Sequence, residues 1–127
     1  MQNQEIVVFI AKHTVALIDE IQKKMKTMNS ASDQMNYLVL TELYSLRTRT
    51  YIVGHEPHFF ELDQEILESQ VLNTFNLIKS KVAKTENLVL LKKITFLISM
   101  LVASIGVGET KNILKILNEM DNLNVLH

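Results

Sequence analysis

Apolar residues recur every three or four positions along most of the chain, with polar residues between them, and this spacing predicts amphipathic helices. Three helices are predicted at residues 4–28, 33–53 and 64–84. A fourth follows Thr85, and a fifth begins in the segment "GVGET". The residues expected to face the core are Val7, Ile10, Leu17, Ile18, Ile21, Met25 and Met28; Met35, Leu38, Val39, Leu43 and Leu46; Leu67, Val71, Phe75, Ile78 and Val82; and Ile113, Leu117 and Met120.

Polar and conformationally special residues predict where these helices begin and end. The segment "TMNSASD" interrupts the first pattern, and Ser30 or Ser32 is the expected cap of the second helix. We expect Gly54 and Pro57 to end that helix, because glycine favours the position after a helix and proline cannot continue one. Asp63 and Thr85 are the expected caps of the third and fourth helices.

The fourth helix differs from the others in being apolar on every side. From Ile94 to Gly108 the sequence "ITFLISMLVASIGVG" contains no charged residue. A membrane span needs about 20 apolar residues, and extending this one backwards brings in Lys92 and Lys93. We therefore expect a helix at the centre of a bundle, with a membrane or a partner surface as the alternative.

These elements predict an all-α protein, a compact up-and-down bundle of four to five helices in a single domain over residues 1–127, with apolar helix four at its centre. The composition agrees, since 127 residues contain only three glycines and one proline. Several apolar stripes are broad, and five short helices do not cover all of that surface. We therefore expect the surplus to be buried in a homodimer.

The absence of cysteine excludes disulfides, thiolate zinc sites, iron–sulfur clusters and a cysteine nucleophile. It fits a reducing compartment, and no basic residue precedes the first apolar run as in a secretory signal. We expect a cytoplasmic protein without a cofactor. The formal net charge of -1 lacks the basic excess that is typical of proteins bound to nucleic acid.

The segment "RTRTYIVGHEPHFFELD", residues 47–63, is where chemistry is most worth considering. Arg49 and His55 have the spacing R-x5-H, and arginine with histidine can hold a phosphate and transfer a proton during RNA cleavage. This spacing resembles the motif of the HEPN family, small all-helical ribonucleases that include toxins. The resemblance implies a metal-independent ribonuclease with its site at a dimer cleft, although Thr50 and Pro57 depart from the residues common in that family.

Two other interpretations of the same segment are open. One is a metal site, because the segment contains His55, Glu56, His58, Glu61 and Asp63, which are residue types that bind zinc or another divalent ion. Pro57 prevents a helical pair of histidines, and we expect no metal site. Alternatively the segment is a helix corner. In that case Arg47 and Arg49 pair with Glu42, Glu56 or Glu61.

Lysines gather between residues 79 and 93 and suggest a weak nucleic-acid surface. Its residues would be Lys79, Lys81, Lys84, Lys92 and Lys93. The preceding segment, residues 55–68, is acidic instead, and such asymmetry suits head-to-tail docking or phosphate contact. A solvated lysine face is the alternative interpretation.

The interpretation that we favour is a non-enzymatic interaction or assembly module, such as a subunit, an adaptor or a chaperone-like protein. It would bind through apolar helix faces, with Phe96, Leu97, Met100 and Leu101 as the candidate packing or partner residues. The HEPN-like ribonuclease is the first alternative. A small helical subunit of a nucleic-acid-binding complex is the second.

Overall fold

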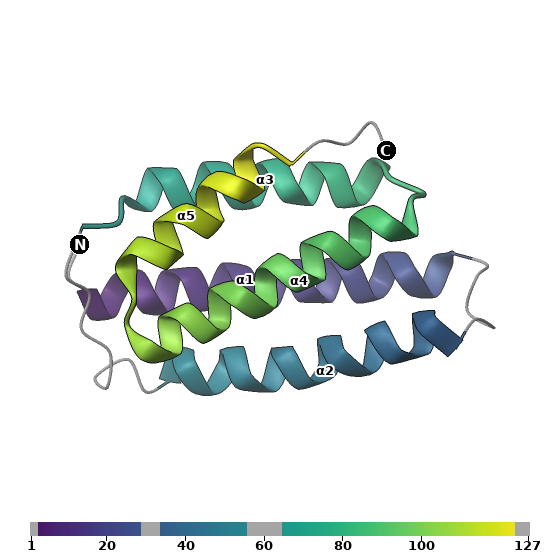
Figure 1. The fold of residues 1–127 in the computed structure, drawn as a ribbon, viewed down its shortest axis with the longest axis horizontal. Helices are drawn as coiled ribbons and strands as arrows, with labels where there is room; N and C mark the ends of the chain where they lie inside the picture. Colours follow the sequence, from purple (N-terminus) through teal and green to yellow (C-terminus); the bar gives the residue numbers. More distant parts are fainter. Residues whose placement is uncertain (1–2, 29–33, 56–64, 124–127) are drawn as a thin grey trace.

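The computed structural model describes residues 3–28, 34–55 and 65–123, which form five helices and no strand. The helices are α1 (Asn3–Thr27), α2 (Gln34–His55), α3 (Glu68–Lys84), α4 (Leu88–Val107) and α5 (Thr110–Asp121). Successive helices run in alternating directions along the long axis of the molecule (Figure 1). The predicted all-α, up-and-down bundle is therefore confirmed.

The helices enclose one hydrophobic core. Helix α1 contacts α2, α3 and α4, and α4 in turn contacts α2 and α5, while α5 also packs against α3 (Figure 1). Every helix contributes side chains with no exposed area, among them Ile18, Leu43, Phe75, Ile98 and Leu117. Most predicted core positions are buried as expected, because their three-and-four spacing keeps them on one side of each helix.

Helix α3 begins later than predicted. Residues 65–67 are not helical, and Leu67 has extended backbone angles, φ -83° and ψ 133°. Because successive side chains point to opposite sides of an extended segment, Ile66 is buried and Leu67 is exposed, so the prediction of Leu67 as a core residue is wrong. Asp63 lies outside the described residues, as do Ser30, Ser32 and Pro57.

The corner between α3 and α4 is capped by a different residue from the one expected. The Asn87 side chain accepts a hydrogen bond from the Val89 amide at 2.9 Å, so Asn87 is the N-cap of α4. Thr85 ends α3 instead, and its hydroxyl accepts a hydrogen bond from the Asn87 amide at 2.9 Å. The prediction of Thr85 as the cap is therefore wrong, because this side chain supports the turn before the helix.

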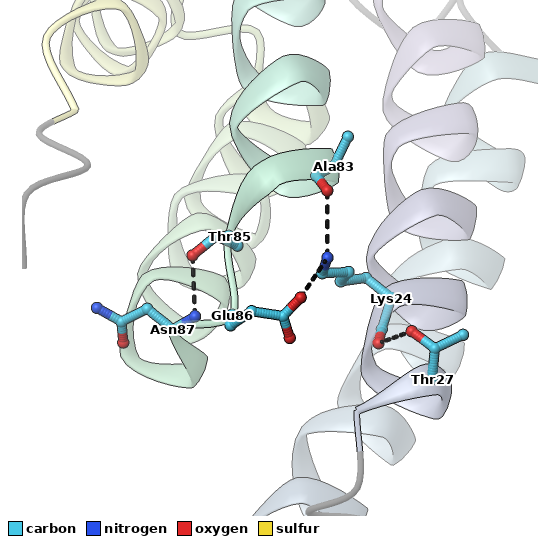
Figure 2. A network of polar contacts seen from close by, with 6 residues as sticks. All are labelled: Lys24, Thr27, Ala83, Thr85, Glu86 and Asn87. Atoms are coloured by element: carbon cyan, nitrogen blue, oxygen red, sulfur yellow. Dashed lines mark hydrogen bonds and ion pairs between the residues drawn. The ribbon is translucent and has the colours of Figure 1, made fainter.

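A lysine from α1 holds this corner in place (Figure 2). The Lys24 ammonium donates to the Ala83 carbonyl oxygen at 3.1 Å and to Glu86 at 3.3 Å. The Ala83 carbonyl lies in the last turn of α3, where helix carbonyls lack backbone partners and favour a cation. Lys24 therefore fixes the end of α1 against the α3–α4 connection.

Gly54 does not end α2, contrary to the prediction, because the helix continues through it to His55. A Cβ atom at this position would lie 2.8 Å from the Ala11 Cβ atom of α1, which is closer than two carbons approach. The missing side chain therefore lets α1 and α2 pack closely. The glycine that does end a helix is Gly108, whose φ of 71° is in the left-handed region.

Candidate interaction surface on α4

The inner side of α4 is core. Its buried residues include Leu91, Ile94, Ile98, Leu101 and Ile105, which face α1, α2 and α5. Among the described residues, α4 alone is long and apolar enough to cross a membrane, and 56% of its most apolar stretch is buried in the bundle. The inner side of α4 therefore lies in the core as expected, whereas its outer side is exposed.

The outer side of α4 is also largely apolar, and no described residue covers it. Apart from Gly106, its exposed positions follow one another at alternating intervals of four and three residues, which places them in a single line along the helix. We call this line the outer seam, and it consists of Val89, Lys93, Phe96, Met100, Ala103 and Val107. Five of its six residues are apolar, and the exposed fraction reaches 66% at Phe96 and 69% at Val107.

Two grooves run beside the outer seam. The groove between α4 and α5 has a volume of about 550 Å³, and its lining includes Val89, Met100, Leu123 and Glu119. The groove between α2 and α4, of about 350 Å³, is lined partly by Leu38 and Ser99. Phe96 borders both grooves, so its ring stands on a ridge between two hollows. An apolar ridge flanked by grooves is suited to packing against another helix.

Charged residues of both signs surround the groove between α4 and α5. Lys92, Lys93 and Glu119 line it, and no ion pair among the described residues uses any of them. Glu119 also borders the neighbouring hollow beside Met100 and Ser104, farther along α4. The groove therefore has an apolar floor, with lysines near one end of α4 and a carboxylate nearer the other.

The four predicted partner residues separate into two pairs. Phe96 and Met100 belong to the outer seam, whereas Leu101 has no exposed area and packs in the core. Leu97 is only 9% exposed and forms part of the wall of the α4–α5 groove. A charged residue at 97 or 101 would therefore disrupt folding before it tested any interface.

Arg49 and His55 lie on different sides of α2. They are six positions apart in a continuous helix, which corresponds to about 120° of rotation around its axis. The Arg49 guanidinium donates to Glu42 at 3.0 Å. The His55 Nδ1 lies 2.8 Å from the Tyr51 carbonyl oxygen, and its ring stacks on Tyr51 with centroids 3.8 Å apart. Within one chain the two side chains do not converge.

The predicted arginine pairs of the helix corner are confirmed for Arg49 and wrong for Arg47. Arg47 donates to Asp19 of α1 at 2.8 Å, and this hydrogen bond and the charge of Asp19 raise the pKa of the guanidinium. Arg47 therefore joins α2 to α1. His55 and Gly54 border a smaller groove between these two helices, of about 220 Å³, with Val8 and Lys12 in its lining.

The five predicted nucleic-acid lysines do not share one face. Lys79 lies near His13 of α1. Burial is the larger cause of the lowered pKa of that imidazole, and the charge of Lys79 lowers it further. Lys81 donates to the carbonyl oxygen of Leu123 beyond α5. Lys84 is exposed near the end of α3, and Lys92 and Lys93 border the α4–α5 groove. These lysines therefore have separate neighbours, and a nucleic-acid surface made of them stays a prediction.

No group of three or more histidine, aspartate or glutamate side chains within the described ranges could hold a metal ion. The segment considered for metal binding lies mostly outside those ranges, since His58, Glu61 and Asp63 are among residues 56–64. Comparison with protein-family models, with curated proteins and with solved structures gives no match for this chain.

The outer seam was not foreseen, although the sequence contains it. Val89, Phe96 and Ala103 are spaced seven residues apart, and so are Lys93, Met100 and Val107. Because α4 is apolar on all sides, however, no polar stripe distinguishes its inner face from its outer one. Glu119 was missed for a different reason. Its place beside α4 depends on the packing of α5, which no local pattern gives.

Proposed function

We propose that this protein acts by binding another protein, as a non-enzymatic interaction or assembly module, and that the outer seam of α4 is its binding surface. One observation carries the proposal: five exposed apolar side chains, with Lys93 as the one charged residue among them, form a line on a helix whose opposite side is packed in the core. Scattered exposed apolar residues are ordinary on proteins, whereas a contiguous apolar line is typical of an interface.

The spacing of the seam supports a helix as the element that binds it. Alternation of four and three residues keeps side chains facing a neighbouring helix over several turns, and the seam extends about 27 Å from Val89 to Val107. The grooves on either side provide room for the side chains of that neighbour. Such a module needs no cofactor, and we propose that it works in the cytoplasm.

Site-specific photo-crosslinking tests this function. A photoreactive phenylalanine analogue at position 96 should give covalent protein adducts in living cells. The same analogue at Tyr44, an aromatic position of α2 that is 50% exposed, is the matched control and should give none. Equal adducts at both positions, or none at either, would contradict a binding role for the outer seam.

The ribonuclease stays a prediction from the motif. The distance around α2 between Arg49 and His55, and the Glu42 carboxylate on Arg49, give it no support from a single chain. Incubation of the purified protein with unstructured RNA in the absence of metal tests it, with His55→Ala as the control.

A further inference from the structure

We infer that the partner of the outer seam is the α4 helix of a second copy of this chain, lying antiparallel to the first across a two-fold axis. This inference rests on the proposed function and makes it specific. Two features of the surface support it: the order of large, small and charged residues along the seam, and the positions of Lys93 and Glu119 in the α4–α5 groove.

The seam is complementary to its own reverse. An antiparallel pair centred between Phe96 and Met100 places a branched residue against a branched residue, a long side chain against a small one, and an aromatic ring against a thioether. It pairs Val89 with the partner's Val107, Lys93 with the partner's Ala103, and Phe96 with the partner's Met100. Contacts between methionine sulfur and aromatic rings are favourable, and alanine leaves space for the lysine stem.

A parallel pair would be less favourable for the same residues. It would place Lys93 directly against the partner's Lys93, so two like charges would meet within an apolar interface. It would also stack Phe96 on the partner's Phe96, while the small Ala103 faced the partner's Ala103 and left a gap. The residue order therefore selects the antiparallel arrangement.

The charges beside the seam agree with this choice. A two-fold axis perpendicular to α4 in the interface keeps α5 on the same side as the partner's α5. Lys93 lies on the α5 side, because it lines the α4–α5 groove and not the α2–α4 groove. Glu119 borders α4 at Met100 and Ser104, which is where the partner's Lys93 arrives in this register. Symmetry forms this ion pair twice.

The groove between α4 and α5 then receives the aromatic ring of the other copy. Met100 lines this groove of about 550 Å³, so the ring of the partner's Phe96 enters beside the sulfur atom with which the register pairs it. The ridge of each copy fills a hollow of the other, as in ridges-into-grooves packing.

Engineered disulfides test the direction of the pairing, and the natural chain has no cysteine to interfere. The double variant Val89→Cys/Val107→Cys should form a covalent dimer on mild oxidation. In this register the thiol at position 89 faces the thiol at position 107 of the other copy. Either single variant should stay uncrosslinked, because the same residue in the two copies lies about 27 Å apart. Both positions are exposed, so the fold is retained. Dimers from the single variants, or none from the double variant, would overturn the inference.

Charge exchange tests the ion pair. Lys93→Glu and Glu119→Lys should each weaken self-association by about tenfold, because every dimer then contains two like-charge contacts. Mixing the two variants should give a heterodimer, in which both contacts are between opposite charges. Equal amounts of homodimer and heterodimer would contradict the pairing.

The two proposals fail in different ways. Photo-adducts at position 96 with foreign proteins alone, together with no disulfide dimer, would overturn the antiparallel copy and leave the binding function. An absence of adducts at position 96 and of disulfide dimers would overturn both.

Discussion

Helices α2 and α4 both expose large side chains to the outside of the bundle, and the two surfaces differ in what those side chains can do there. On α2 the exposed aromatic residues are Tyr37, Tyr44 and Tyr51, which recur every seven residues as predicted. Each phenol keeps a hydroxyl that can bond water. The outer seam of α4 presents Phe96 and Val107, which have no polar group.

The neighbours of the two surfaces differ in the same sense. The Lys26 Nζ atom lies 5.5 Å from the centroid of the Tyr44 ring, and the Tyr51 ring stacks on His55. The arginines of α2 bind carboxylates of the same chain. Lys93 and Glu119 beside α4 have no ion pair within the described residues. Exposed area alone therefore does not mark an interface. The proposal for α4 rests instead on a line of apolar side chains together with neighbouring charged residues that form no ion pair.

The largest expected effect separates the two sides of α4 itself. Leu101→Ala should lower the free energy of unfolding by about 2–5 kcal/mol, because it removes a fully buried side chain and leaves a cavity. Phe96→Ala, measured at concentrations where the chain is monomeric, should cost less than about 1 kcal/mol. Urea unfolding followed by circular dichroism gives both values, and similar losses would contradict the assignment of the outer seam.

The next prediction compares aromatic residues of the two helices. Phe96→Ala should weaken self-association by about 2 kcal/mol, or roughly thirtyfold in Kd, because a central apolar anchor is lost. Tyr44→Ala should leave Kd unchanged. Sedimentation equilibrium measures both constants, and a similar loss for the two variants would show that the α2 edge takes part in the same contact.

Glycine substitutions distinguish a closed helix contact on α2 from an open position on α4. Gly54→Ala should destabilise the fold by about 1–3 kcal/mol, because the added carbon meets the Ala11 Cβ atom at 2.8 Å. Gly106→Ala has nothing within 4 Å and should stabilise by about 0.5–1 kcal/mol through helix propensity. Thermal unfolding should therefore show a lower midpoint for Gly54→Ala and a higher midpoint for Gly106→Ala. Ala11→Gly should restore the stability of the Gly54→Ala chain.

The smallest expected effect is a pH dependence of the folding stability, which arises from His13 and does not involve the outer seam. His13 lies between Phe9 and Phe75, and burial, followed by the charges of Lys79 and Lys12, lowers its pKa, while Glu68 opposes the shift. The unfolded chain therefore binds the proton more tightly, and stability falls as pH drops below the unfolded value of about 6.5. His13→Gln should reduce the slope of urea midpoint against pH between neutral and mildly acidic solution. An unchanged slope would contradict this role.

Most of the fold was predictable from the sequence, because core stripes such as that of α5 depend only on helical spacing. Leu38 was an exception: it continues the apolar stripe of α2 and is 60% exposed, beside the α2–α4 groove. Helix ends were predicted less well. The roles of Gly54 and Thr85 depend on Ala11 of another helix and on the turn at Asn87.

The candidate site was predictable only in part, since Phe96 and Met100 lie on its surface and Leu101 does not. A helix that is apolar all round does not reveal which side its neighbours cover. The place of Glu119 required knowledge of how α5 crosses α4. These are tertiary relations, which periodicity along one helix does not contain.

The most direct test of the central claim is the solution mass of the purified chain, determined by light scattering over a range of concentrations. Burial of the outer seam against a second copy predicts twice the 14.6 kDa chain mass, falling to the single mass for Phe96→Glu with its helical circular dichroism unchanged. A natural chain that stays at 14.6 kDa at every concentration would contradict the self-pairing of α4.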